Sequence, residues 1–198
     1  MKGMVKLGLT LALYATAACV GLALVYSATS ETIAQRQQAD LQSALRELFP
    51  QGDEFTDMTG TLKSPDPGVS FETQYAIRGG ATLLGVAIQA STPSYGGNIT
   101  VLVGVGVGGA ISRVKILSHQ DTPGLGANAA SPTYYVDKAA KLTFSGQFGG
   151  KAVSDPFVVK EDVAAITAST ITSRAVATAV KAVADAGAAW FASQKEGL

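Results

Sequence analysis

The stretch Thr167-Ala168-Ser169-Thr170-Ile171-Thr172-Ser173 lies directly before an alanine-rich segment at the end of the sequence. Five of its seven residues carry a hydroxyl group. Serine and threonine are frequent where a helix begins, because their side chains accept hydrogen bonds from the free N–H groups of the first turn. The same position also suits a phosphate group, since those N–H groups and the positive end of the helix dipole converge there. The stretch therefore predicts a helix start and leaves two roles open, a cap or an anion site.

The segments around this stretch predict an α+β fold. After it, residues 173–194 carry apolar side chains at helical spacing, although Gly187 interrupts them. Before it, short segments rich in valine and isoleucine predict the strands of a mostly antiparallel sheet at residues 71–78, 82–90, 99–105 and 111–118. Further predictions are a helix at 30–49, a short helix at 134–140 and a short strand at 157–160. One central sheet with flanking helices follows from this order.

The glycines at 104, 106 and 109 fit the pattern G-x-G-x-x-G, which in dinucleotide-binding proteins precedes a helix. Here the following residues, 110–118, partly alternate and contain Ile111, Val114 and Ile116, so they predict a strand. The glycines therefore predict a tight hairpin and not a nucleotide site.

Composition excludes several classes of protein. Basic and acidic residues both number 15, so the chain lacks the basic excess of a general nucleic-acid binder. With one cysteine, Cys19, and one histidine, it can form neither an internal disulfide nor a zinc site of the Cys/His type. Redox chemistry would therefore have to come from an organic cofactor or from partner proteins.

Residues 7–26 form an uncharged stretch of 20 residues, long enough as a helix to cross the roughly 30 Å hydrocarbon core of a membrane. Lys2 and Lys6 precede it, and the positive-inside rule then places residues 1–6 in the cytoplasm. The expected organisation is a cytoplasmic N-terminus (1–6), a transmembrane helix (7–26), a juxtamembrane helix (27–50) and an extracytoplasmic domain (51–198). A cleaved signal peptide ending near Ala28 or a lipoprotein signal at Cys19 fits less well, because Tyr26 is bulky and the apolar run continues past Cys19.

Three separated segments resemble the motifs of one family. Residues 166–173 resemble the flavinylation motif of FMN-binding domains, D-x-x-(S/T)-G-A-T followed by x-T-S. Residues 119–126 resemble the H-x-E-T-P-G-L-G loop of the same domains, and residues 94–99 resemble their G-Y-x-G-x-I segment. With the N-terminal span and the order of the motifs, the whole chain is similar to the G subunit of the Rnf electron-transport complex.

The resemblance implies that Thr170 carries FMN through a phosphoester, which a dedicated flavin transferase makes on the outer side of the membrane. It also implies a cofactor site whose residues come from two segments: Thr167, Ala168, Ser169, Ile171, Thr172 and Ser173, and Thr122, Pro123, Gly124, Leu125 and Gly126. The flavin carries the chemistry, so no catalytic side chain and no metal are expected. The chain would be an electron-carrier subunit of a membrane-bound, ion-translocating ferredoxin:NAD⁺ oxidoreductase, with other integral membrane subunits as partners.

The sequence departs from the family pattern at three places. Ala168-Ser169 replaces Gly-Ala, so a side chain stands where glycine's backbone freedom would be used. Ala164 stands where the motif has an acid, with Asp162 two residues earlier, and Asp121 stands where the turn usually has Glu.

Three alternatives remain open at this point. One is the C subunit of a sodium-translocating NADH:quinone reductase, which shares the domain. Another is a stand-alone extracytoplasmic FMN carrier. The third belongs to another class, a membrane-anchored binding or scaffold domain without a cofactor, in which the hydroxyl-rich run only caps a helix.

Overall fold

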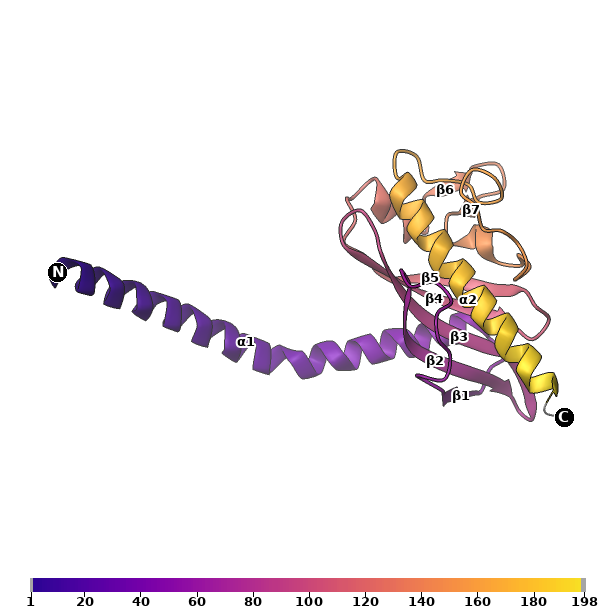
Figure 1. Cartoon of the computed structure of the whole chain (residues 1–198), viewed down its shortest axis with the longest axis horizontal. Coiled ribbons are helices and arrows are strands. Elements are labelled where there is room, and N and C mark those ends of the chain that lie inside the picture. Colours follow the sequence, from indigo (N-terminus) through magenta and orange to yellow (C-terminus); the bar gives the residue numbers. More distant parts are fainter. Residues whose placement is uncertain (1, 197–198) are drawn as a thin grey trace. The chain divides into compact units, whose positions relative to one another are not determined.

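A computed structural model describes residues 2–196, and it divides into two compact units, residues 1–43 and 44–198 (Figure 1). The first unit belongs to a single helix, α1 (Lys2–Leu48). The span predicted at 7–26 and the helix predicted at 30–49 are continuous, because neither glycine nor proline interrupts residues 22–49. By length and composition α1 can cross a membrane. Its last turn belongs to the second unit, where Ala44, Leu45 and Leu48 are buried.

The second unit is built on a five-stranded antiparallel sheet with strand order β1-β2-β3-β4-β5. The strands are β1 (Glu54–Asp57), β2 (Ser70–Gly79), β3 (Thr82–Pro93), β4 (Asn98–Gly106) and β5 (Ile111–Ser118). Each strand pairs with the next along the chain, so the sheet is a simple meander. The four predicted strands are confirmed, and β1 is an addition to them. The predicted α+β class is confirmed.

The C-terminal helix α2 (Thr170–Glu196) packs on the sheet against β3 and β4. Val176, Val180 and Val183 are fully buried, as their helical spacing predicts. Gly187 lies against β4, where an added Cβ would stand 3.2 Å from the Val105 side chain. Gly187 has a low helix propensity, but its missing side chain lets α2 approach the sheet closely. Although α2 is also apolar enough to span a membrane, 61% of its apolar window is buried in the domain.

The glycines around residue 106 form the predicted hairpin. The N–H group of Gly109 donates to the carbonyl oxygen of Gly106 at 2.9 Å, and β5 follows directly at Ile111. No helix starts here, so a dinucleotide-binding role for this pattern is excluded by the local structure.

The connection from β5 to α2 is long and mostly irregular, and both elements predicted within it are wrong. Residues 134–140 form strand β6 (Tyr135–Asp137), which pairs with β7 (Leu142–Thr143), and then a turn. The turn forms because the Asp137 carboxylate accepts hydrogen bonds from the N–H groups of Ala139 and Ala140, at 2.8 and 3.0 Å. Residues 157–160 form no strand, since Phe157 and Lys160 have positive φ angles of 53° and 76°.

Aromatic packing holds this connection together. Phe144 and Phe148 are fully buried and meet edge to face, with ring centroids 5.7 Å apart. Phe148 also stacks on Phe157 at 6.3 Å. The connection also contains two short 3₁₀ helices, η1 (Gly126–Ala129) and η2 (Gly146–Phe148). Buried aromatic contacts of this kind add apolar packing to a segment that contains little regular secondary structure.

Candidate functional site

The hydroxyl-rich run folds into a tight turn and the first turn of α2. Ser173 holds this turn: its Oγ donates to the carbonyl oxygen of Ser169 and accepts the N–H of Ile166, both at 2.9 Å. Within residues 2–196, no side chain accepts a hydrogen bond from the N–H groups of Thr170, Ile171 or Thr172. The run begins a helix as predicted, but its hydroxyls do not cap those N–H groups. The helix entrance therefore keeps donors available for an anion.

Asp121 joins this helix entrance to two other segments. Its Oδ2 accepts hydrogen bonds from the hydroxyls of Thr172 and Ser94, both at 2.7 Å, and its Oδ1 accepts the N–H of Gly96 at 2.6 Å. The side chain is 5% exposed. Gly126 makes the approach possible, because an added Cβ would stand 2.5 Å from Thr172 Oγ1 and 2.7 Å from Asp121 Oδ2. One buried carboxylate thus connects all three segments that carry the family resemblance.

The hydrogen bonds also keep Asp121 ionised. Burial by itself raises the pKa of this carboxyl, but the donors from Ser94, Thr172 and Gly96, with a smaller charge interaction from His119, outweigh burial and hold the pKa below its ordinary value of 3.8. A carboxylate that accepts several hydrogen bonds keeps its negative charge even with little solvent contact. The site therefore contains a fixed anion at neutral pH.

The segment after Asp121 forms a turn whose geometry follows from its sequence. The N–H of Leu125 donates to the carbonyl oxygen of Thr122 at 3.1 Å, with Pro123 and Gly124 at the two central positions. Gly124 has a φ of 76°, which is the requirement for the third position of a type II turn, while proline favours the second. This turn presents Leu125, which is 42% exposed.

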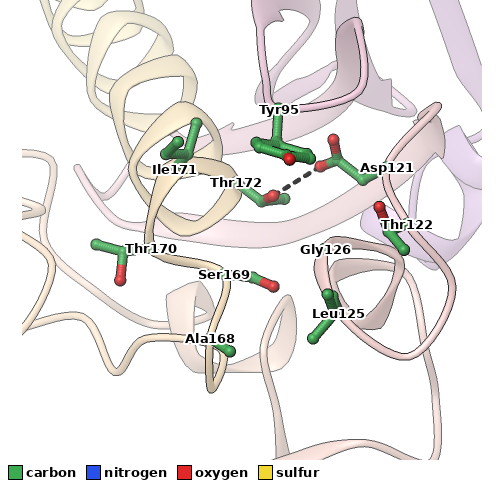
Figure 2. Close-up of a pocket in the computed structure, with 10 residues that line it drawn as sticks. All are labelled: Tyr95, Asp121, Thr122, Leu125, Gly126, Ala168, Ser169, Thr170, Ile171 and Thr172. Atoms are coloured by element: carbon green, nitrogen blue, oxygen red, sulfur yellow. Dashed lines mark hydrogen bonds between the residues drawn. The ribbon is translucent and has the colours of Figure 1, made fainter.

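A pocket of about 650 Å³ lies where these segments meet (Figure 2). Its volume falls in the range of small-molecule sites, roughly 300–1,000 Å³. It is lined by Tyr95, Asp121, Thr122, Leu125, Gly126, Ala168, Ser169, Thr170, Ile171 and Thr172. Six large apolar side chains are exposed in residues 44–194, namely Tyr95, Val107, Leu125, Leu142, Val158 and Ile171. Three of them, from three separate segments, line this pocket, so it combines an apolar wall with hydroxyls and free N–H groups.

The structure brings most of the predicted site residues together. Ala168, Ser169, Thr170, Ile171 and Thr172 share the pocket with Thr122, Leu125 and Gly126. Thr167, Ser173, Pro123 and Gly124 do not line it and instead shape the two turns. Tyr95 and Asp121 line it but were not among the predicted site residues. The signal for both was present, since each lies in a segment that resembles the family, but the hydrogen bonds that bring Asp121 into the site reach residues 25 to 51 positions away in the sequence.

Ala168 has a φ of 58°, in the left-handed region that favours glycine. It is one of four non-glycine residues with positive φ in the described chain, and it stands where the family motif has glycine. The backbone of this turn therefore keeps the glycine conformation although the residue is alanine. The cost of this conformation for an alanine is about 1–2 kcal/mol.

Replacing Ala168 by glycine is expected to stabilise the domain. Relief of the left-handed conformation outweighs the greater chain entropy of glycine in the unfolded state, leaving a net gain of about 0.5–1 kcal/mol. The matched control is Ala164→Gly, at an exposed position without positive φ, which should lose a similar amount. Urea unfolding of both variants measures the difference, and equal effects of the two substitutions would contradict strain at Ala168.

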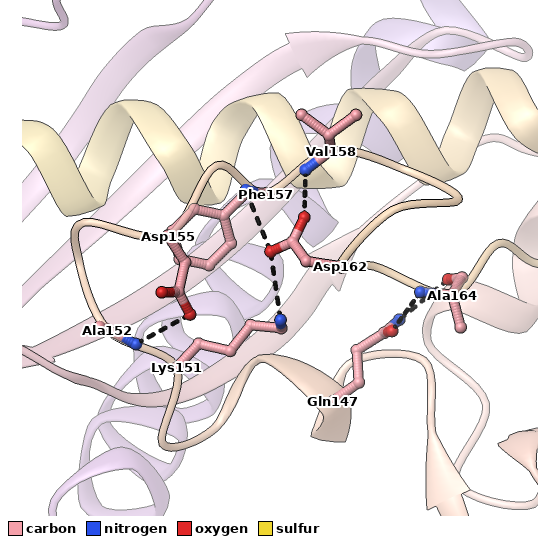
Figure 3. A network of polar contacts seen from close by, with 8 residues as sticks. All are labelled: Gln147, Lys151, Ala152, Asp155, Phe157, Val158, Asp162 and Ala164. Carbon is pink, nitrogen blue, oxygen red and sulfur yellow. Dashed lines mark hydrogen bonds and ion pairs between the residues drawn. The ribbon is translucent and has the colours of Figure 1, made fainter.

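The acid expected at position 164 is absent, and Asp162 does not replace it in the pocket (Figure 3). The Asp162 carboxylate accepts the N–H groups of Val158 and Phe157, at 2.6 and 3.2 Å, and pairs with Lys151 Nζ at 3.2 Å. At position 164 the backbone is held by Gln147, whose side chain bonds both its N–H and its carbonyl oxygen, at 2.7 and 3.1 Å. Asp162 therefore shapes the loop in which a strand was wrongly predicted.

Asp162 gives the stability of the domain a specific pH dependence. Burial raises its pKa, but the N–H groups of Val158 and Phe157 and the charge of Lys151 outweigh this and hold the pKa below its ordinary value of 3.8. The carboxylate therefore contributes stability that is complete above that value and is lost as the pH falls through the lower pKa of the folded state. We expect Asp162→Asn to lose less unfolding free energy than the wild type between about pH 6 and about pH 3 in urea titrations. An equal loss in both proteins would exclude this role.

Comparison with known proteins agrees with this geometry. The family model of the FMN-binding domain matches residues 94–185, and the model of the RnfG N-terminal region matches residues 1–48. The first range contains all ten residues that line the pocket. The pocket at the start of α2 therefore lies in an FMN-binding domain.

Several relatives align with most of this chain. The G subunit of the proton-translocating ferredoxin:NAD(+) oxidoreductase complex of Clostridium ljungdahlii is 33% identical over 165 residues, which cover 81% of this chain and 78% of that protein. The G subunit of the ion-translocating oxidoreductase complex of Aliivibrio fischeri is 34% identical over 198 residues, which cover 95% and 90%. The G subunit of the ion-translocating oxidoreductase complex of Vibrio cholerae is 32% identical, with coverage of 89% and 86%.

The alignments cover most of this chain and most of each relative. The two family models match the N-terminal helix and the region from residue 94 into α2. The chain therefore belongs to the G-subunit family of Rnf-type ion-translocating oxidoreductase complexes.

Proposed function

We propose that this chain is the electron-carrier subunit of an Rnf-type complex and that it holds FMN covalently through a phosphoester to Thr170. The flavin supplies the redox chemistry, since it accepts and releases electrons. The chain's own residues would bind the cofactor, fix its orientation and set its electrostatic surroundings. The observation that carries the proposal is the pocket, in which the family's two motif segments meet at a helix entrance.

Hydrogen bonding favours Thr170 over Thr172 and Ser173 as the attachment point, and burial favours it over Ser169, which is only 8% exposed. Thr172 donates its hydroxyl to Asp121 and is 1% exposed, and Ser173 has both of its bonds committed and is fully buried. Thr170 lines the pocket, is partly exposed and makes no side-chain hydrogen bond within the described residues. Its hydroxyl is therefore available to attack phosphorus. In that step the Thr170 oxygen would form the new P–O bond to the FMN phosphate of a phosphoanhydride donor, the P–O bond to the donor's other phosphate would break, and that departing phosphate would take up the hydroxyl proton.

The helix entrance suits the phosphate that would result. The N–H groups of Thr170, Ile171 and Thr172 lack protein partners within residues 2–196, and they lie at the positive end of the 27-residue helix α2. At an exposed site, such a helix terminus stabilises a nearby anion by about 0.3–1 kcal/mol. The phosphoester would therefore satisfy donors that the hydroxyl-rich run itself leaves unpaired.

The apolar wall suits the other end of the cofactor. Tyr95, Leu125 and Ile171 are 72%, 42% and 56% exposed, and all three line the same pocket, as is typical of a binding site. A flavin ring lying over them would remove this surface from water at about 25 cal/mol per Å². The pocket thus offers a polar end for a phosphate and an apolar wall for an aromatic ring, which fits FMN.

The membrane anchor supports the wider assignment. Lys2 and Lys6 precede the apolar part of α1, so we expect the N-terminus in the cytoplasm and residues 51–198 on the outer face. A flavin transferase on that side would modify Thr170. The other integral membrane subunits of the complex would donate and accept the electrons. The names of the relatives favour this complex over a quinone reductase or a stand-alone carrier.

Intact-mass analysis of the full chain, produced with and without its flavin transferase in detergent, tests the proposal. We expect the mass of one esterified FMN to be added only with the transferase, on the tryptic or chymotryptic peptide that contains Thr170. A protein that keeps its unmodified mass would contradict covalent attachment. Co-purification of the tagged chain with integral membrane proteins tests the assignment to a complex separately.

A further inference from the structure

The lining of the pocket contains a single charged side chain. Of its ten lining residues, Asp121 is the only one that is ionised at neutral pH, and no lysine, arginine or histidine lines it. We propose that Asp121 is a fixed negative charge that lowers the reduction potential of the flavin in this pocket. The inference rests on the proposed function, since it assigns a role toward the FMN expected there.

The structure gives this charge a defined position. Three donors bind both carboxylate oxygens at 2.6–2.7 Å: the hydroxyls of Ser94 and Thr172 donate to Oδ2, and the N–H of Gly96 donates to Oδ1. None of these three donors is charged, so they orient the carboxylate without forming an ion pair with it, and the only charge interaction on Asp121 comes from His119, which lies outside the lining of the pocket. Neither an ion pair with Asp121 nor a cation in the lining occurs within residues 2–196. The charge therefore acts on whatever occupies the pocket.

Reduction of the flavin is sensitive to such a charge. When FMN takes up two electrons and one proton, the ring gains one negative charge, and a nearby carboxylate repels it. In a partly buried site this repulsion is screened less than in water. The oxidised, uncharged ring is not affected in the same way, so the carboxylate shifts the equilibrium toward the oxidised form.

Coulomb's law gives the order of magnitude of this shift in reduction potential. A unit charge about 10 Å from the ring, at an effective dielectric constant of about 20, changes the ratio of reduced to oxidised flavin by about tenfold. For a two-electron couple a tenfold change corresponds to about 30 mV. A shift of this size is well within the resolution of a redox titration.

The test is a spectroelectrochemical titration of the full chain carrying FMN, in detergent, with the wild type, Asp121→Asn and Asp162→Asn. We expect Asp121→Asn to raise the midpoint potential by about 30 mV. Asp162→Asn also removes a hydrogen-bonded carboxylate, but from a loop outside the pocket, and should keep the wild-type potential. A wild-type potential in Asp121→Asn, or the same rise in both variants, would overturn the inference.

A second variant separates charge from structural disturbance. Thr172→Val keeps the net charge of Asp121 but removes one of the three hydrogen bonds that draw negative charge away from its oxygens, so the carboxylate repels the reduced ring more strongly and the potential should fall. If the two substitutions acted only by disturbing the pocket, there would be no reason for the midpoint potential to rise in Asp121→Asn and fall in Thr172→Val. A rise of the potential in Thr172→Val would therefore overturn the inference. This variant also decides the question if Asp121→Asn fails to fold. The intact mass is measured beforehand, so a missing phosphoester is recognised separately, and protein that binds FMN without the ester is titrated in the same way.

Discussion

Thr170→Val is expected to lose covalent FMN completely while the domain stays folded. Valine has nearly the shape of threonine but lacks the hydroxyl that would form the phosphoester. The Thr170 side chain makes no hydrogen bond within residues 2–196, and it is partly exposed. Its removal therefore leaves no buried donor or acceptor unpaired, and the effect on stability should stay within about 0.5 kcal/mol. Intact mass and flavin fluorescence after denaturing electrophoresis measure the loss.

The matched control lies in the same run. Thr167 is exposed, lies outside the pocket and bonds to Tyr134, whose hydroxyl is 3.3 Å from its Oγ1. Thr167→Val should therefore carry FMN as the wild type does. Thr170→Ser keeps a hydroxyl at the same place and should retain at least part of the modification. FMN that remains bound through denaturation in Thr170→Val would assign the attachment to another residue.

Phe148→Ala should have the largest effect on stability, a loss of about 3–5 kcal/mol of unfolding free energy. Phe148 is fully buried and contacts both Phe144 and Phe157, so alanine would leave a cavity between two aromatic rings. The effect reaches the site, because these rings hold the irregular connection that leads into the start of α2. Such a loss is a large part of the roughly 5–15 kcal/mol that stabilises a typical domain.

Trp190, the single tryptophan, lies on α2 and reports unfolding of this domain by fluorescence in urea. The control is Phe148→Leu, which fills most of the space and should lose clearly less than the alanine variant. If Phe148→Ala lost less than about 1 kcal/mol, the aromatic cluster would not be the main support of the connection.

The sheet and the last helix were predictable because local patterns determine them. Alternating or continuous Val and Ile residues predicted β2 to β5, and the spacing of Val176, Val180 and Val183 predicted α2. β1 was missed because only four residues pair with β2 and its buried surface is small. The two wrong elements, at 134–140 and 157–160, share one cause. In each, an aspartate side chain, Asp137 or Asp162, takes backbone N–H groups that a helix or strand would have used.

The candidate site was only partly predictable. The motif segments gave Thr122, Leu125, Gly126 and the run from Ala168 to Thr172, all of which line the pocket. Asp121 was noticed only as a departure from the family pattern. Its importance depends on Ser94, Gly96 and Thr172, which lie 27, 25 and 51 residues away in the sequence. Hydrogen bonds between such distant residues leave no periodic signal along the chain.

By itself, the sequence determined the apolar helix at the N-terminus, four strands of a mostly antiparallel sheet, the helix after the hydroxyl-rich run and the family resemblance. These features depend on composition and on periodicity over a few residues, where local sterics and apolar burial act. Only the tertiary structure decided which hydroxyls of the run are committed to other groups, that Ala168 keeps a glycine conformation, and that Asp121 is the one charged residue that lines the pocket. Each of these depends on which groups meet after folding, because hydrogen-bond partners and backbone angles are set there by packing and not by the neighbouring residues.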